Sequence, residues 1–594
     1  MDTSHPCNIH VGWSTKECRI KMRITIIRPP FYLLTGPAAA PAVLAGFLRE
    51  HGHEAISFDV NQYCIDHLLH PSAINNALIH VDHFDSRYLG AHAKTVLPTS
   101  ILHAVEDLRY SSTYASPILY RTAQRDIETA LSLHASVHRN TLWTTDTYTI
   151  NHIDTDPQCL FDTVETGGEL FDGAIDEALI ALREYAPDVV AISICVPQQL
   201  YGALRIAYRL KIILPLCHIT LGGATITRLR RAVQQLPRIF DFVDTVILRE
   251  GELPLVALLG ALSQGLDPLN YVQGVLARRG TIVAESSRHS EASLHAFDIR
   301  TLPPPVFEDI YQGRYLSPQL LLPISTTRNC YYDKCDFCAI SRSFNHGYRE
   351  MTPAQICNIM ENLSTQYDQP IFKDVSEALP PRLVFALSDE LAKRDRYFDW
   401  EAYLRFEKAF DDKATAKKLR KAGLRVAYLG LETGSQALSD RMHKHNNLTV
   451  AENTIRLFAN EGIWVHLFLM SGHPGETESD HEATLSFLRR NRDYVHSIRA
   501  APFGLEIDSN LAHIGQKYGI KTENHESISL SVRLAASTLG EVPDNVTVSR
   551  RLDEIRHVAY EESKGTLRGA RYVWDGHRIM FAVHAGGPHV PTME

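Results

Sequence analysis

Three cysteines, Cys330, Cys335 and Cys338, lie within nine residues and follow an apolar run that begins at Leu320. Closely spaced thiolates suit soft metals better than disulfides, which favours an iron–sulfur cluster or zinc. No fourth cysteine is near, since Cys357 lies on a predicted helix downstream. Three thiolates on a four-iron cube leave one iron open for a substrate or cosubstrate. A zinc knuckle and a chance cluster are the alternatives.

The composition indicates a globular protein of several domains. The chain has 594 residues, 44% of them hydrophobic and 22% charged, which predicts two to four domains of roughly 100–200 residues each. The net charge of −9 disfavours general nucleic-acid binding. Ten cysteines, of which three cluster, favour a reduced, cytoplasmic setting. We expect no membrane span and, in residues 1–21, a disordered tail rather than a secretory signal.

The first half of the sequence alternates strands and helices. A strand at 23–30 ends in two prolines, a helix at 40–52 follows, and a second strand covers 54–59, which is the unit of a parallel sheet. Strands resume at 188–194, 219–223 and 245–248. We therefore predict a Rossmann-like domain over 22–280 with a helical insertion at about 62–172 and no clear strand between 85 and 149. The insertion's histidines match no standard metal spacing, so we expect surface or core residues: His80, His83, His92, His103, His134 and His138.

The second half predicts a different α/β domain. After a proline-stiffened linker at 281–319, six strand–helix units over 320–505 suit a partial (β/α)6 barrel of the TIM type, with its site at the carboxyl ends of the strands. A small C-terminal α+β region, 506–594, has a predicted helix at 549–562 and a predicted strand pair at 571–574 and 578–583. It either covers a substrate at the barrel mouth or only packs there.

Several motifs occur in the order seen in one enzyme family. Two prolines end the first strand, Gly52 and His53 precede the second, Pro187–Val190 opens the third, and Gly222-Gly223 and Gly251-Glu252 follow later strands. The second half adds the three cysteines, Phe337 and two glycine-containing motifs at residues 430–435 and 472–477. Together the pattern resembles the cobalamin (B12)-dependent radical S-adenosylmethionine (SAM) enzymes, in which a B12-binding domain precedes a radical SAM domain. Two features depart from that family. The first cysteine gap holds four residues rather than the usual three, and no Asp-x-His-x-x-Gly motif supplies a lower cobalt ligand.

The resemblance implies three cofactors and assigns residues to each. Cys330, Cys335 and Cys338 would hold a 4Fe-4S cluster. In SAM, Asp374 or Glu377 would accept from the ammonium group, Arg405 would pair with the carboxylate, Glu432 would hold the ribose, and the backbone near Phe337 would contact adenine. Salt bridges at the barrel rim are the alternative for the charged residues. Cobalamin would lie against residues at the strand ends of the first domain: Pro30, Ser193, Gly222, Gly223, Glu250 and Gly251.

The resemblance also implies a reaction, the methylation of a carbon atom. A 5′-deoxyadenosyl radical from SAM would activate a natural-product or peptide substrate, as in antibiotic biosynthesis, and methylcobalamin would supply the methyl group. The electron would come from a flavodoxin or ferredoxin. A non-methylating cyclisation, rearrangement or oxidation is an open alternative. A tRNA methylthiotransferase would need three more placed cysteines, whereas Cys64, Cys159, Cys195 and Cys217 are scattered. A non-catalytic cobalamin sensor would not need the cysteine triad.

Overall fold

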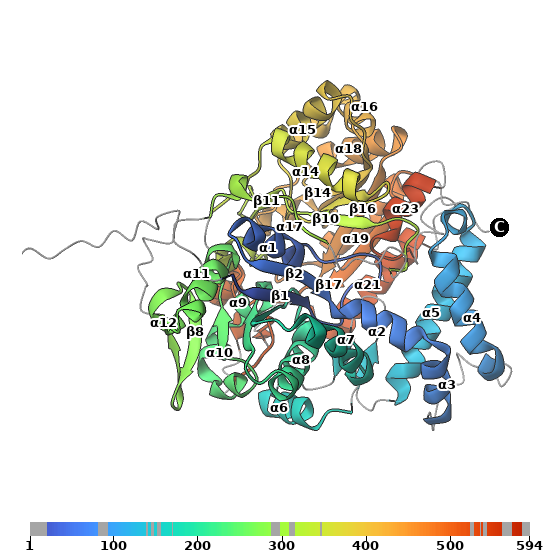
Figure 1. Ribbon diagram of the computed structural model, residues 1–594. Helices are drawn as coiled ribbons and strands as arrows, with labels where there is room; N and C mark the ends of the chain where they lie inside the picture. Colours follow the sequence, from blue (N-terminus) through green and yellow to red (C-terminus); the bar gives the residue numbers. More distant parts are fainter. Residues whose placement is uncertain are drawn as a thin grey trace, which may run out of the picture.

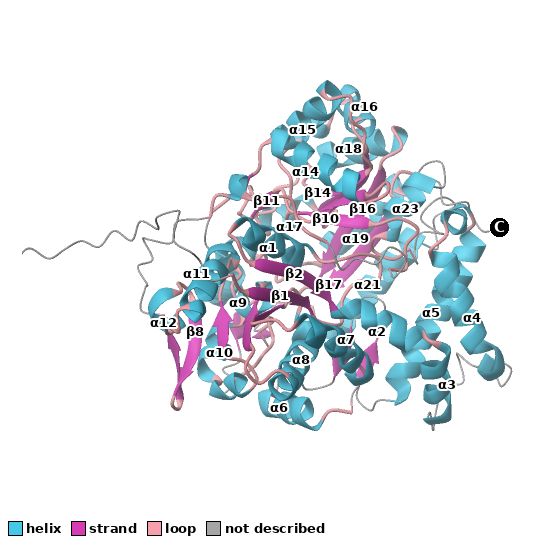
Figure 2. Cartoon of the chain, in the orientation of Figure 1, coloured by secondary structure: helices cyan, strands magenta, loops and turns pink. Residues whose placement is uncertain are grey.

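The computed structural model describes residues 21–80, 93–137, 141–143, 148–150, 156–168, 170–286, 297–307, 315–344, 347–522, 528–534, 536–538, 543–560 and 573–584. Two large sheets form the molecule's two halves, with helices on their faces (Figures 1 and 2). The predicted tail lies outside the described residues except for its last position, and so do His83, His92 and His138.

The first sheet has the strand order β2-β1-β5-β6-β7-β8-β9. Its parallel strands are β1 (Arg23–Arg28), β2 (Glu54–Asp59), β5 (Val189–Ser193), β6 (His218–Gly222) and β7 (Thr245–Ile247). The antiparallel hairpin of β8 (Val275–Arg279) and β9 (Ile282–Glu285) extends the edge beyond β7. The order of the parallel strands reverses between β1 and β5. In open α/β sheets a ligand binds at such a reversal, beyond the carboxyl ends of the strands.

Alternate side chains of β1 enter two hydrophobic cores, since neighbours on a strand face opposite sides. Ile24 and Ile26 pack with α1 (Ala39–Glu50) and α11 (Glu252–Ser263), whereas Ile27 packs with α7 (Asp172–Tyr185) and α8 (Leu200–Ile213). Burying each isoleucine contributes about 1.5–3 kcal/mol. Shorter helices complete this half: α9 (Ala224–Arg228), α10 (Arg230–Gln235) and α12 (Pro268–Tyr271).

The helical insertion is confirmed, with one correction. Helices α2 (Val60–Leu69), α3 (Pro71–His80), α4 (Ala93–Leu108), α5 (Pro117–Val137) and α6 (Pro157–Thr166) form it, and several of them extend from one side of the molecule (Figure 1). The prediction of no strand in this region is wrong. Strands β3 (Thr141–Trp143) and β4 (Tyr148–Ile150) pair as an antiparallel hairpin. Their aromatic and β-branched residues suit that conformation.

The second sheet is the predicted partial barrel. Its order is β10-β13-β14-β15-β16-β17, every neighbouring pair is parallel, and the strands are β10 (Leu321–Ile324), β13 (Ile371–Asp374), β14 (Trp400–Leu404), β15 (Leu424–Glu432), β16 (Trp464–Ser471) and β17 (Ser497–Pro502). The outer face packs against helices whose apolar residues share one core: α14 (Pro353–Gln366), α15 (Pro381–Lys393), α16 (Lys413–Lys421), α18 (Leu448–Asn460) and α19 (Glu478–Asn491).

The C-terminal region differs from its prediction at the end. The expected helix is α21 (Asn545–Tyr560), but 577–584 form the helix α23 (His577–His584) rather than a strand. Ile579, Met580, Phe581 and Ala582 are all buried. The run resembles a strand in sequence because the period of a short apolar run does not distinguish a buried helix from a strand. No helix among the described residues is both long and apolar enough to cross a membrane.

Candidate functional site

The cysteine loop leaves the barrel after β10 and is closed at its base by a short ribbon. Strands β11 (Thr327–Arg328) and β12 (Arg349–Glu350) pair antiparallel on either side of it. Asn329 and Asp333 adopt left-handed backbone conformations, with φ of 61° and 49°, which turn the chain tightly. The three thiols of the triad are free and half-buried. The ribbon thus presents all three on one compact loop.

Two cations border the thiol of Cys335. Arg405, just beyond β14, has Nη1 3.8 Å from Sγ of Cys335 and its guanidinium carbon 3.4 Å from the centre of the Tyr332 ring. Its Nη2 donates to the carbonyl of Lys444 at 2.8 Å, and Nζ of Lys444 pairs with Glu432 at 2.9 Å. Burial raises the pKa of the Cys335 thiol, and Lys444 and Arg405 act against that rise. Burial also raises the pKa of Cys338 to about 12.

The donor set fits an iron–sulfur cluster. Without a metal the buried thiols favour the protonated form, and coordination removes the proton. Nowhere in the described residues do three His, Cys, Asp or Glu side chains converge on a single ion. A 4Fe-4S cube places each thiolate on a different iron, so its ligands need not converge on one point. The cations beside Cys335 then favour the thiolate that a cluster requires.

The predicted SAM residues lie at the carboxyl ends of neighbouring barrel strands. Asp374 is buried and accepts from Thr326 Oγ1 at 2.5 Å and from the Ser376 amide at 2.9 Å; burial raises its pKa to about 6. Glu432 pairs with Lys444, whose Nζ lies 5.9 Å from the Phe337 ring centre. The structure thus groups Phe337, Arg405 and Glu432 around Lys444, a residue that sequence reasoning missed because it follows a loop after α17 (Gln436–Arg441).

Glu377 lies just beyond β13, near Arg228 of the first half of the molecule and near Glu506. Its side chain is solvent-accessible, yet burial and then Glu506 raise its pKa to about 7. Cys195, just beyond β5, has the same character: it is accessible, while burial raises its pKa, Arg28 lowers it and Glu377 raises it. The influence of Glu377 on the pKa of Cys195 shows that the end of β5, at the strand reversal of the first sheet, lies near the end of β13 in the barrel.

The predicted contacts of the first domain fall into two sets. Pro30, Ser193, Gly222 and Gly223 lie where β1, β5 and β6 end, next to the strand reversal. Gly223 has φ of 102°, and a Cβ there would lie 2.5 Å from the Ile194 carbonyl oxygen, so only glycine fits. Glu250 lies elsewhere, with its carboxylate on Arg349 of β12 at 2.6 and 2.9 Å. Gly251 directly precedes α11.

A polar network fills the lower part of the barrel. Nζ of Lys373 (β13) is 3.1 Å from Glu401 (β14) and 2.9 Å from Asp575, which lies two residues before α23. Tyr428 (β15) donates to both carboxylates, at 3.1 and 3.2 Å. Although burial acts against it, Lys373 and Arg578 lower the pKa of Asp575. The C-terminal region thus closes the barrel floor, a role that no sequence motif indicated.

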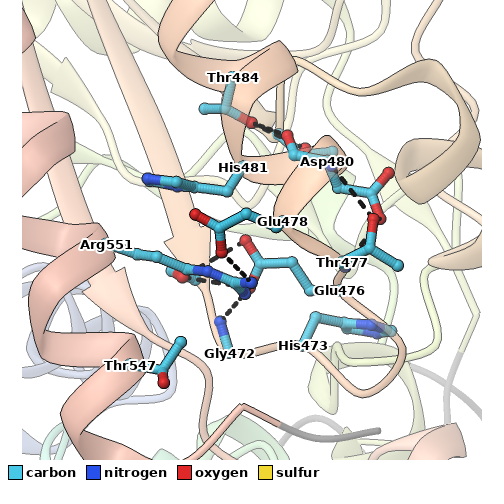
Figure 3. A network of polar contacts seen from close by, with 12 residues as sticks. Gly472, His473, Glu476, Thr477, Glu478, Asp480, His481, Thr484, Thr547 and Arg551 are labelled. Atoms are coloured by element: carbon cyan, nitrogen blue, oxygen red, sulfur yellow. Dashed lines mark hydrogen bonds and ion pairs between the residues drawn. The ribbon is translucent and has the colours of Figure 1, made fainter.

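A second part of the C-terminal region holds the loop after β16. Figure 3 shows Arg551 of α21 directed at Glu476 and Glu478; its nitrogens lie 3.3 and 3.0 Å from them. Glu476 also accepts from the amide of Gly472 at 2.5 Å, which closes the loop on itself. In the same loop, burial lowers the pKa of His473 to about 4. Because α21 packs beside β16 and β17, this end of the barrel has a fixed wall.

Comparisons with known proteins agree with this geometry. Residues 324–488 match the sequence model of the radical SAM superfamily. A protein of Pyrococcus horikoshii named uncharacterized methyltransferase PH0819 is 22% identical over 326 residues, which cover 54% of this chain and 68% of that protein.

Two solved structures share the fold. Cobalamin-dependent SAM radical enzyme OxsB, with aqua-cobalamin and SAM bound, matches at a TM-score of 0.57 and 13% identity over 87% of this chain; the present chain covers 64% of OxsB. Radical SAM methyltransferase TsrM from Kitasatospora setae, with cobalamin and a 4Fe-4S cluster bound, matches at 0.53 and 13% identity over 86% of this chain and 82% of TsrM.

The family match and the cysteine loop define a radical SAM domain in this chain. Residues 324–488 of this chain form a domain of the radical SAM superfamily, which implies a 4Fe-4S cluster and SAM as cofactors. The two-domain α/β architecture as a whole is that of the cobalamin-dependent radical SAM enzymes.

Proposed function

We propose that this protein is a cobalamin-dependent radical SAM methyltransferase that methylates a carbon atom of a natural-product or peptide substrate. The observation that carries the proposal is the juxtaposition of two strand ends: Cys195, just beyond β5 at the strand reversal of the first sheet, and Glu377, just beyond β13 of the barrel, are both exposed and lie near each other. A planar cofactor at that reversal would face a substrate held in the barrel. OxsB and TsrM, which have this fold, are described as holding cobalamin.

When bound, the three cofactors supply the radical and the methyl group, while the protein supplies binding, orientation and exclusion of water. Arg405 and Lys444 keep positive charge beside Cys335, and the Lys444–Glu432 pair fixes the rim around Phe337. Asp374 is held by Thr326 and Ser376 at the end of β13. Pro30, Ser193, Gly222 and Gly223 would border the cobalamin. The substrate and a flavodoxin or ferredoxin as electron donor are parts of the proposal.

Metal content tests both cofactor sites in one preparation. The protein would be purified without oxygen from cells supplied with cobalamin, and iron, sulfide and cobalt would be measured per chain. We expect about four irons and one cobalt. Cys335→Ala should lose iron and keep cobalt. Iron without cobalt, after reconstitution, would remove the cobalamin part of the proposal.

A matched pair of glycine variants tests where the cobalt lies. Gly222→Leu places a side chain at the end of β6, beside the reversal, where a Cβ would meet the Ile247 oxygen at 3.4 Å. It should lose cobalt and keep iron. Gly260→Leu on α11, where nothing lies within 4 Å of a Cβ, is the control and should keep both. Equal cobalt in the two variants would contradict the assignment to this strand end.

The reaction itself requires mass spectrometry of substrate candidates. Under full turnover, a product heavier by one methyl group in place of hydrogen, together with 5′-deoxyadenosine, would support carbon methylation. A converted substrate with no added methyl mass would instead indicate a cyclisation, rearrangement or oxidation on the same scaffold.

A further inference from the structure

Arg499, in the middle of β17, is a cation on the inner face of the barrel. It is in register with Phe468 of β16, and residues in register on parallel strands point to the same side of a sheet. Phe468 stacks on Tyr403 inside the barrel, with ring centres 6.0 Å apart. The neighbour of Arg499, Ile498, packs in the outer core, which also turns Arg499 inward. The pKa of buried His466 is lowered mainly by burial and by Arg578, and the charge of Arg499 lowers it further. This effect also indicates that Arg499 lies on the inner side.

This arginine differs from the other inward-facing cations. Lys373 and Arg578 pair with Asp575, Lys444 pairs with Glu432, and Arg405 approaches Glu407 at 3.6 Å. Arg499, by contrast, is exposed and has neither a hydrogen bond nor an ion pair with any residue that the structure describes. A guanidinium has five donors and no acceptor, so this exposed cation on the inner face of the barrel is available to an anionic ligand.

The wall next to Arg499 is aromatic. Tyr403, Tyr428 and Phe468 form a cluster in which each ring neighbours the other two, with ring centres 4.9, 6.0 and 6.2 Å apart and planes inclined by 14° to 27°. Tyr403 and Phe468 are only half-buried, so part of each ring is accessible. Beneath them, the Lys373–Asp575 network closes the floor. Among the described groups, the inner face of the barrel therefore offers one unpaired cation near a cluster of aromatic rings.

We propose that Arg499 binds the carboxylate of the substrate while a planar, apolar part of that substrate lies along Tyr403 and Phe468. This assignment rests on the proposed function, because it takes the barrel interior as the substrate chamber. A carboxylate matches the guanidinium in a two-bond, side-by-side arrangement. A single unpaired arginine suits a monoanion better than a phosphate, which usually recruits several donors.

The experiment measures binding of 2-naphthoate, a planar carboxylate, to the full chain by equilibrium dialysis, with and without SAM. 2-Naphthamide, which keeps the ring and lacks the charge, is the matched probe. We expect the wild-type protein to bind the acid at least about tenfold more tightly than the amide. Arg499→Met should remove that difference and leave amide binding unchanged, and Arg499→Lys should restore part of it. Since the side chain of Arg499 forms no hydrogen bond or ion pair with the described residues, the melting temperature of each variant should match that of the wild type.

Arg492→Met is the control. Arg492 lies between α19 and β17, and its nearest acid is Asp493 at 3.9 Å. It should bind the acid as the wild type does. The proposal is overturned if Arg499→Met keeps the preference for the acid, or if the wild type has none. 2-Naphthyl phosphate is the third probe. If it binds more tightly than the acid and its binding depends on Arg499, the proposed ligand of Arg499 is a phosphate and not a carboxylate.

These outcomes are separable from those of the cobalamin proposal. Dialysis needs no cobalt, so Arg499-dependent binding in a protein that takes up no cobalamin would keep the substrate assignment and remove the methyl donor. If iron and cobalt contents are normal but the acid does not bind, the cobalamin assignment is kept and the substrate assignment is removed.

Discussion

At the scale of single residues, the positive charge beside Cys335 has a consequence for electron transfer. Arg405 lies 3.8 Å from the Cys335 sulfur and is held by the Lys444 carbonyl and the Tyr332 ring. Positive charge near a cluster favours its reduced form, because reduction adds negative charge. The pair of cations therefore makes the cluster easier to reduce.

We predict that Arg405→Gln shifts the cluster midpoint potential to a more negative value by about 60 mV, the equivalent of one tenfold change in a one-electron equilibrium. Iron content should be unchanged, because all three thiols remain. Redox titration followed by electron paramagnetic resonance measures the shift. Arg396→Gln, an exposed arginine paired with Glu361, should leave the potential as it is, and an unshifted Arg405→Gln protein would refute the charge argument.

Glu377 predicts a pH dependence of stability. Burial and Glu506 raise its pKa from 4.5 to about 7 in the folded protein. A carboxyl with a raised folded pKa contributes stability that is present below its unfolded pKa and is lost as the pH rises through the folded value. Glu377→Gln cannot ionise, so its melting temperature should equal that of the wild type near pH 4.5 and exceed it above about pH 7. Parallel curves for the two proteins in differential scanning fluorimetry would contradict this prediction.

At the scale of elements, α21 is fastened to the loop after β16 by a buried ion pair. The side chains of Arg551 and Glu476 are 5% and 4% exposed. Removing one partner of such a pair leaves an uncompensated buried charge, whereas an exposed pair contributes little. The adjacent Arg550 is 46% exposed and contacts Glu478 and Glu554, so the two neighbouring arginines each pair with two glutamates but differ in burial.

We predict that Arg551→Met lowers the free energy of unfolding by about 3 kcal/mol and that Arg550→Met changes it by less than about 1 kcal/mol. Urea denaturation of the two variants and the wild type gives these differences. Equal losses would show that burial does not set the strength of this contact.

The elements also show what the sequence could and could not predict. The barrel strands and the cysteine loop were predictable because period-two apolar runs and closely spaced cysteines are local signals. Helix α23 was not, since Ile579 to Ala582 are buried on all sides and only tertiary contacts select the helix. Arg499 could have been found from the alternation of Ile498 and Arg499 on a predicted strand. Asp575 could not, because its partner Lys373 lies 202 residues away.

At the scale of the whole molecule, ion pairs join the first domain to the cysteine loop. Arg328, at the base of the loop, contacts Glu252 at 2.7 Å, and Arg349 on the facing strand contacts Glu250. On another side of the interface, Arg230 forms a two-bond pair with Asp508. The loop that carries the cysteines is therefore fixed from the first domain as well as from the barrel.

We predict that Arg328→Gln, which leaves the 3%-exposed Glu252 carboxylate without its partner, destabilises the protein by about 3 kcal/mol. Because this contact joins domains, calorimetry should also show a broader or divided transition. Arg382→Gln removes a pair of which the arginine is 69% exposed and is the control. A single, unshifted transition in Arg328→Gln would mean that the domains are held together without this contact.

The Lys373–Asp575 contact also bears on how the chain matures. Lys373 and Glu401 are synthesised well before Asp575, which follows Lys373 by 202 residues. Earlier parts of a chain tend to fold first. Until Asp575 is made, Glu401 is the only one of the two carboxylate partners of Lys373 that is present. Water must therefore solvate the part of the Lys373 charge that Asp575 later neutralises. A nascent barrel thus stays hydrated at its base, and its dry interior is completed only after the segment around residue 575 has been synthesised.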